Sequence, residues 1–267
     1  MPSAEEAELA GPGLPLRWLL APLLIAIAAL AIGGGTDIDR TIMRLVYDAQ
    51  SAAFPLRNSF WLDVVMHHWT KYVVVTLGCL VLAALVLSFV LPAFGNRRIL
   101  LFLLLALTLA PLSVTVGKAV SNSHCPWDVE DFGGLVPYTR LFAQLPADIE
   151  PGHCFPAGHA STGFALMAFY FAGYALRKPR AARIALWTAA AAGLVLGAGR
   201  VLQGAHFVSH VVWAGVFCWM VTVLLYVLVL QPAARRAGTA LLPSTSNQAA
   251  RPAQSEAPLD GIPRSSP

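Results

Sequence analysis

Residues 207–230 read FVSHVVWAGVFCWMVTVLLYVLVL, a run of 24 residues without a single Asp, Glu, Lys or Arg. An α-helix needs about 20 consecutive apolar residues to cross the hydrocarbon core of a bilayer. The whole chain shares this bias, since 57% of its 267 residues are apolar and only 12% are charged, whereas soluble domains carry roughly 25% charged residues. The sequence therefore indicates an integral membrane protein and excludes disordered, disulfide-scaffold and soluble dinucleotide-binding classes.

The other apolar segments predict an all-α membrane protein with six spans, packed as a helical bundle. Each segment is close to the length that a transmembrane helix needs. The spans are expected at 16–34, 72–93, 99–117, 157–176, 184–200 and 207–230. A cleaved signal peptide is the alternative for the first span, because small residues follow it at Gly33–Gly35. The acidic residues upstream of that span disfavour this alternative.

Basic residues predict which side each loop faces, because Lys and Arg in short loops mark the cytoplasmic side. Three basic clusters alternate along the chain as an even number of spans requires: Arg97 and Arg98; Arg177, Lys178, Arg180 and Arg183; Arg235 and Arg236. Both termini are therefore expected in the cytoplasm, and 35–71, 118–156 and 200–206 on the outer side. The arm 1–15 and the tail 231–267 have the composition of disordered segments, which leaves 16–230 as the transmembrane domain.

Apolar residues recur at helical spacing between the first two spans: Ile38, Ile42, Leu45, Val46 and Ala49. Charged residues stand between them: Asp39, Arg40, Arg44 and Asp48. The pattern predicts an amphipathic helix lying along the membrane interface, and an ordinary packed loop helix explains it equally well. No chemistry is expected from this segment.

Ionisable side chains gather in the outer segments. Five of the seven histidines lie there: His124, His153, His159, His206 and His210. Lys118 and Arg200 each stand at the outer end of a span. One such residue alone would be interpreted as an interface anchor. Three separate segments that deliver Lys, His and Arg to one leaflet instead predict an active site facing the outer membrane surface.

The spacing of these residues forms three motifs. Lys118 is followed after six residues by Cys125-Pro126. Pro156-Ala157-Gly158-His159 opens the fourth span, and Arg200 is followed after five residues by His206. This order resembles the signature of the type 2 phosphatidic acid phosphatase family, the integral-membrane lipid phosphatases: Lys, six residues, Arg-Pro; Pro-Ser-Gly-His; Ser-Arg, five residues, His, three residues, Asp. The resemblance covers 118–210 in motif and all six spans in layout.

The resemblance implies a lipid phosphatase that needs no metal or other cofactor. Lys118, Arg200 and the backbone N–H groups near Gly158 would bind the phosphate oxygens, because fixed cations stabilise the charge of the transition state and a helix start favours an anion. His206 matches the nucleophile, which forms a phosphohistidine intermediate. His159 matches the general acid that protonates the departing alkoxide.

The chain departs from the signature at four positions: Cys125 for Arg, Ala157 for Ser, Gly199 for Ser, and His210 for the final Asp. The family Asp orients the nucleophilic imidazole and offsets its developing charge. A neutral His210, one helical turn from His206, is expected to accept a hydrogen bond from it without supplying charge. His210 is a candidate catalytic residue because of this role.

A carboxylate for His206 is expected from an earlier segment, because residues 151–255 contain no Asp or Glu. The outer loop offers five candidates: Asp128, Glu130, Asp131, Asp148 and Glu150. The retained Lys118, His159, Arg200 and His206 favour a divergent active branch. The alternative is a degraded relative that binds or transfers a phospholipid headgroup without turnover.

The four cysteines divide into two pairs. Cys79 and Cys218 lie inside spans and are interpreted as small core residues. Cys125 and Cys154 both lie in the outer loop, where an oxidising compartment permits a disulfide. A disulfide between them and two free thiols are the two possibilities that the sequence leaves open.

A zinc site is the competing interpretation from another class. His206 and His210 have the i, i+4 spacing of metal ligands on a helix, with His153, Cys154 and His159 nearby. The protein would then be a zinc-dependent membrane hydrolase. Two observations argue against this: no Glu stands between the two histidines, and two cations lie close to them in the motifs.

The family implies several substrates: phosphatidic acid, phosphatidylglycerol phosphate, polyprenyl pyrophosphate and the phosphates of lipid A. The phosphoryl group is transferred either to water or to another acceptor. The basic chain and the topology favour a bacterial inner membrane with the site facing the periplasm. The expected partner is therefore a phosphorylated lipid within the membrane and not a nucleic acid.

Overall fold

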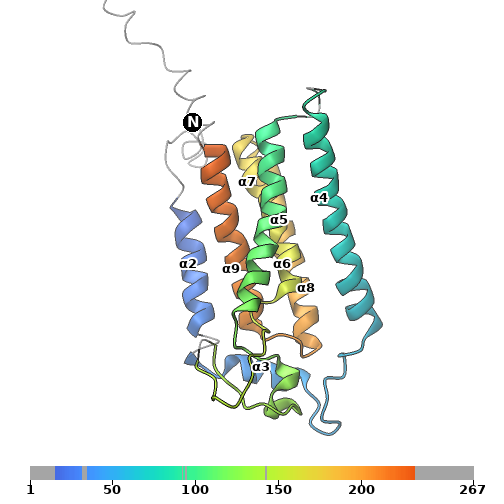
Figure 1. The fold of residues 1–267 in the computed structure, drawn as a ribbon, viewed down its shortest axis with the longest axis vertical. Helices are drawn as coiled ribbons and strands as arrows, with labels where there is room; N and C mark the ends of the chain where they lie inside the picture. Colours follow the sequence, from blue (N-terminus) through green and yellow to red (C-terminus); the bar gives the residue numbers. More distant parts are fainter. Residues whose placement is uncertain (1–15, 32–34, 92, 94, 142, 232–267) are drawn as a thin grey trace, which may run out of the picture.

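The computed structural model describes residues 16–31, 35–91, 93, 95–141 and 143–231 (Figure 1). Within these ranges the chain forms helices and loops, with two isolated β-bridges and no strand. The predicted all-α class is confirmed. The expected terminal arm and nearly all of the expected tail lie outside the described residues.

Among the described residues, four helices are long and apolar enough to cross a membrane: Trp61–Leu87, Arg97–Ala119, Pro179–Leu202 and Val208–Leu230. They correspond to the second, third, fifth and sixth expected spans. The first of the four joins the π-helical turn η2 (Trp61–Trp69) to α4 (Thr70–Leu87), and therefore begins well before the expected position 72. The others are α5 (Arg97–Ala119), α8 (Pro179–Leu202), and α9 (Val208–Leu225) with its extension η7 (Tyr226–Leu230).

Shorter helical pieces occupy the positions of the first and fourth expected spans. α2 covers Arg17–Leu30. The fourth position holds α6 (Gly158–Phe164), the turn η6 (Ala165–Met167) and α7 (Ala168–Ala175) in direct succession. Both pieces run alongside the longer helices in the bundle (Figure 1). Neither is a single helix of spanning length in the part of the chain that the structure describes.

Local side-chain chemistry sets two of the helix starts. The Asn96 side chain accepts a hydrogen bond from the Arg98 backbone N–H at 2.9 Å and so caps α5. Pro179 occupies the first position of α8, where its missing N–H costs nothing.

Aromatic packing fastens α2 to the bundle. Trp18 is 1% exposed, and its ring meets those of Phe171, Tyr174 and Tyr226 edge-on at centroid distances of 4.6, 4.7 and 4.8 Å. Its indole N–H donates a hydrogen bond to the Tyr170 hydroxyl at 2.8 Å. A buried indole with a satisfied N–H gains both packing and polar stabilisation, so Trp18 anchors α2 against α7 and α9.

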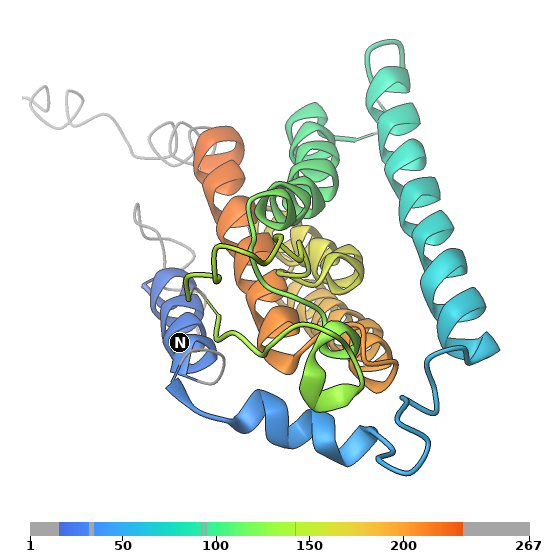
Figure 2. The same cartoon turned by 60° about the horizontal axis from the view of Figure 1, so that its bottom comes forward.

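Four helix ends coincide at one end of the bundle, which we call the motif end: α5 ends there, α6 begins, α8 ends and α9 begins. Helix α3 (Ile38–Val46) lies across this end, beside the loop between α5 and α6 (Figures 1 and 2). It turns Asp39, 2% exposed, and Met43 inward, and leaves Ile38 and Leu45 exposed. The expected amphipathic helix is therefore present, but a carboxylate belongs to its buried face.

Two glycines allow α6 and α8 to pack closely. A Cβ atom added to Gly163 would overlap the Gly193 backbone nitrogen, and one added to Gly193 would overlap the Phe164 ring. Small residues at a helix crossing permit backbones to approach closely in membrane proteins. This crossing holds α6, which begins with motif residues, against α8, which ends with them.

We expect Gly163→Ala to destabilise the protein by about 1–3 kcal/mol, because the added methyl group overpacks the α6–α8 crossing. Thermal unfolding in detergent measures the effect. Gly78→Ala on α4 is the matched control, since an added Cβ there meets nothing within 4 Å. Equal unfolding temperatures for the two variants would contradict the prediction.

Candidate active site

All three motif segments line one hollow at the motif end, with a volume of about 360 Å³. The motif residues that line it are Lys118, Gly158, His159, Arg200 and His206. Residues more than 80 positions apart in the sequence thus share one cavity. The hollow also contains Lys71, which comes from the first turn of α4.

The cations of the hollow are held in place by their neighbours. Arg200 donates from Nη1 to Gln203 Oε1 at 2.7 Å, and its guanidinium carbon lies 5.8 Å from the Trp127 ring centroid. Gln203 is fixed in turn, because it donates to the Arg57 carbonyl at 3.1 Å. The Lys118 stem runs beside Gly158, where an added Cβ would lie 3.7 Å from Lys118 Cδ. The Arg200 charge is therefore preorganised at the hollow, and Lys118 lies beside it.

His206 is 5% exposed and stands in the loop between α8 and α9. Burial lowers the pKa of His206 well below its usual value, and His210, Lys118 and Arg200 lower it further, while a backbone hydrogen bond with Cys154 opposes them. The imidazole is therefore neutral at neutral pH. A neutral ring retains the nitrogen lone pair that a nucleophile needs.

His210 lies behind His206 and outside the set of residues that line the hollow. Its Nε2 is 3.2 Å from Ser123 Oγ, whereas its ring centroid is 5.8 Å from that of His206. The ring packs edge-on between Phe155 and Phe207, at 5.4 and 5.3 Å. The imidazole is larger than the carboxylate it replaces and is placed by this aromatic packing, so its observed polar neighbour is Ser123 rather than His206.

The segment before and within α4 contacts the second motif. His159 Nε2 lies 2.6 Å from the Met66 carbonyl oxygen and 3.2 Å from Thr70 Oγ1. The short distance to a carbonyl indicates that Nε2 carries the proton and donates it. His159 thus faces the hollow while its Nε2 contacts the first of the four long helices, Trp61–Leu87.

A disulfide joins Cys125 to Cys154, whose Cα atoms are 5.2 Å apart. It closes the loop between α5 and α6 and fixes Cys154 against the third motif, with Sγ 3.5 Å from His206 Nδ1. The Cys154 N–H also donates to the Ser123 carbonyl at 2.8 Å. Of the two remaining cysteines, Cys218 is buried as expected, but Cys79 is exposed on α4, so its interpretation as a core residue is wrong.

A family model, described as the PAP2 superfamily, matches residues 99–233, just over half of the chain. The chain belongs to the PAP2 superfamily. No curated protein and no solved structure gives a significant match. The family resemblance of the motifs is therefore confirmed, and membership implies phosphatase-type activity in a membrane-associated protein. Helices α2, α3 and α4 lie before the matched range.

This PAP2 protein contains a cluster of potential zinc ligands, but the cluster is not suitable for binding zinc. Potential ligand atoms of Cys154, His206 and His210 lie within 4.8 Å of one another. However, the Cys154 sulfur is bonded to Cys125, and zinc binds a thiolate rather than a disulfide sulfur. With the disulfide formed, the cluster offers only two imidazoles.

None of the five outer-loop acids is among the described residues that line the hollow of this PAP2 protein. Asp131 Oδ2 accepts a hydrogen bond from Arg40 Nε at 2.6 Å. Glu130, Asp148 and Glu150 line a separate hollow of about 640 Å³. A carboxylate that does reach the third motif is that of Asp39, which accepts hydrogen bonds from the Ser209 N–H, at 3.0 Å, and from the Ser209 hydroxyl.

Sequence reasoning missed Asp39 and Lys71. Asp39 lies in a segment to which no chemistry was assigned, and its contact with Ser209 joins residues 170 positions apart. Lys71 stands just before the expected start of the second span. The criterion that singled out Lys118 and Arg200, a cation at the outer end of a span, applies to Lys71 as well and would have found it.

The disulfide predicts a specific pattern of thiol labelling. In intact detergent-purified protein, a membrane-permeant thiol reagent should label Cys79, which is exposed on an apolar helix, without reduction, and Cys125 and Cys154 only after reduction. Cys125→Ser with Cys154→Ser should lower the stability by up to about 3–4 kcal/mol, because the unfolded chain regains the freedom of the 29-residue separation. Cys79→Ser is the matched control and should leave the unfolding temperature unchanged. Labelling of the outer-loop pair without reductant would contradict the prediction.

Proposed function

We propose that the protein is a membrane lipid phosphatase that hydrolyses a phosphomonoester or pyrophosphate of a lipid at the outer face of the membrane. The observation that carries the proposal is the hollow at the motif end. It joins two histidines with Lys71, Lys118 and Arg200, and none of the described residues that line it is acidic. Such a site attracts a phosphate dianion and stabilises the charge that develops during phosphoryl transfer.

In the proposed reaction, His206 attacks phosphorus in line with the departing lipid oxygen. Its Nδ1 faces Cys154, which leaves Nε2 as the attacking atom. The N–P bond forms as the P–O bond to the lipid breaks, and the product is a phosphohistidine. Water then attacks the same phosphorus and releases inorganic phosphate, which regenerates neutral His206. Lys71, Lys118 and Arg200 supply the positive charge for the phosphate, and the proposed scheme uses no metal.

His159 is the proposed general acid for the lipid oxygen. In the described structure its Nε2 donates to the Met66 carbonyl. Acting through Nε2 therefore requires that this hydrogen bond be exchanged for one to the departing oxygen. The acid in this step is the protonated imidazolium of His159, and the neutral imidazole that remains then serves as the base that activates water in the second step.

The proposed location is a bacterial inner membrane, with the motif end facing the periplasm. The four long apolar helices support membrane insertion. The proposal adds α2 and the α6–α7 pieces as two further crossings, which brings both termini to the cytoplasm. The basic pair Arg97 and Arg98 stands at the opposite end of α5 from Lys118, as the positive-inside rule requires.

The proposed function is tested by phosphate release from a panel of lipid monophosphates and pyrophosphates, with EDTA present. Wild type should release phosphate, and His206→Ala should lose activity by several orders of magnitude, because the nucleophile is gone. His124→Ala, in the separate outer-loop hollow, is the control. Loss of wild-type activity with EDTA would support the zinc alternative. Lipid binding without release by wild type would support the degraded relative.

Lys71 is expected to bind substrate phosphate. It would supply the positive charge that the family Arg provides at the position of Cys125. Lys71→Met should lower kcat/KM about 10- to 100-fold, which corresponds to one lost charge-assisted hydrogen bond of about 1.5–3 kcal/mol. Lys71→Arg should retain most of the activity. Arg98→Met, at the opposite end of the bundle, is the control for a lost surface cation. Equal kcat/KM for Lys71→Met and wild type would exclude this role.

A further inference from the structure

Asp39 is a buried carboxylate that the proposed mechanism does not use. It projects from α3, a helix outside the range matched by the family model. Only 2% of its surface is exposed. Its Oδ1 accepts a hydrogen bond from the Ser209 backbone N–H at 3.0 Å, and its Oδ2 accepts one from the Ser209 hydroxyl. A buried charge is retained only where specific partners compensate its lost hydration.

The partner of Asp39 is the first turn of α9. This helix begins at Val208, so Ser209 lies in its first turn, where the backbone N–H groups lack partners within the helix. The helix dipole also favours a negative charge there. Asp39 therefore caps α9 from a distant part of the chain.

The first turn of α9 connects two motifs. His206 stands just before this turn, in the loop that leads into it. The carbonyl of His210, within the turn, accepts a hydrogen bond from the Ala157 N–H at 3.0 Å. Ala157 directly precedes Gly158 and His159, where α6 begins. Hydrogen bonds at the adjacent residues Ser209 and His210 thus link Asp39, through the backbone of the first turn of α9, to the second motif.

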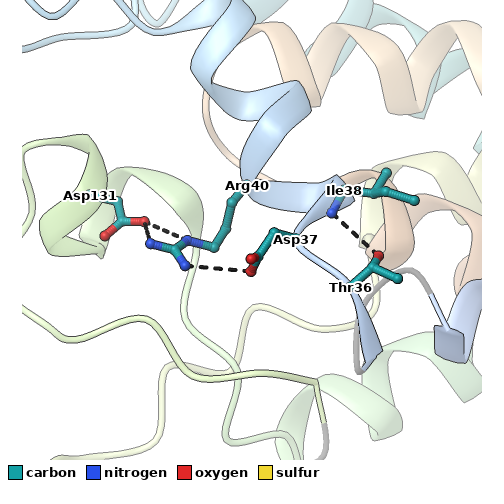
Figure 3. Close-up of polar contacts among 5 residues, drawn as sticks. All are labelled: Thr36, Asp37, Ile38, Arg40 and Asp131. Carbon is teal, nitrogen blue, oxygen red and sulfur yellow. Dashed lines mark hydrogen bonds and ion pairs between the residues drawn. The ribbon is translucent and has the colours of Figure 1, made fainter.

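The next residue of α3, Arg40, attaches the same helix to the outer loop. Its guanidinium contacts Asp131 at 2.6 Å and Asp37 at 3.5 Å (Figure 3). It also lies 5.0 Å from the ring centroid of Tyr138, which packs against Phe207 at 5.7 Å. Consecutive residues of α3 therefore connect to α9 and to the loop that covers it, which fixes where the Asp39 carboxylate stands.

We propose that Asp39 is a positioning residue for the phosphoryl-transfer step: by holding the first turn of α9, it fixes His206 and the second motif relative to each other. This inference rests on the proposed function. The cations that bind phosphate are on other helices, Lys118 on α5 and Arg200 on α8. Loss of the Asp39 contact therefore displaces the reacting groups and leaves phosphate binding in place.

The kinetic test uses Asp39→Ala, Asp39→Asn and Ser209→Ala, with Arg44→Gln, at an exposed charged residue of the same helix, as the control. For the best lipid phosphate of the wild type, Asp39→Ala should lower kcat by about 100-fold, as a displacement on the order of 1 Å does, with little change in KM. Asp39→Asn keeps an acceptor for the Ser209 N–H, so its kcat should fall less than that of Asp39→Ala. Ser209→Ala keeps the hydrogen bond from the backbone N–H to Asp39, so its kcat should also fall less than that of Asp39→Ala. Arg44→Gln should match wild type.

A second readout does not depend on turnover. Hydrogen–deuterium exchange of the detergent-purified protein should increase in Asp39→Ala at 155–163 and 203–212 together, and remain unchanged in α5. Asp39→Asn should show the same pattern more weakly, which keeps the test decisive if Asp39→Ala does not fold. Failure of wild type to release phosphate would contradict the proposed function, and the exchange data would still test the coupling.

Two outcomes would overturn the positioning role. One is an unchanged kcat in Asp39→Asn and Ser209→Ala together with a lower unfolding temperature, which would make Asp39 a helix cap and nothing more. The other is exchange that increases in the 203–212 segment alone, which would show that α9 does not carry the effect to the second motif.

Discussion

A bilayer interior provides no hydrogen-bond partners for the backbone, so a chain that crosses it must do so as helices whose N–H and C=O groups bond within each segment. Polar chemistry is then confined largely to helix ends. In this protein α5, α6, α8 and α9 place their motif-bearing ends together, and the glycine contact between Gly163 and Gly193 brings α6 close to α8. The hollow depends on that meeting of helix ends.

Much of the fold could be predicted because long apolar runs define it. The third, fifth and sixth expected spans agree with α5, α8 and α9 within a few residues. Fixed spacing likewise identified the motif residues that line the hollow, because each motif stands at a helix end, but it did not identify Lys71. The fourth expected span differs, since a tight turn at Ala165–Met167 divides it into two short helices. Hydropathy does not register such a turn, because all of its residues are apolar.

What the sequence could not supply are contacts between distant segments. The position of Asp39 on the buried side of α3 depends on the shape of α8 and α9 beneath it, not on the apolar spacing of α3 itself. The partner of His210 is decided by the rings of Phe155 and Phe207, which leave its Nε2 beside Ser123. The acids of the outer loop lie close in sequence to the motifs, yet Asp131 is bonded to α3 instead.

The family match begins at residue 99 and therefore leaves out helices α2, α3 and α4, although these helices belong to the same bundle. A fragment beginning there would keep every signature residue. It would lose the Asp39 carboxylate that contacts Ser209, the Met66 carbonyl that contacts His159, and the ammonium group of Lys71. Similarity to the superfamily is concentrated in the later helices, while the earlier third of this chain contributes its own groups around them. Divergence between relatives is therefore to be sought in this preceding region as much as in the motifs.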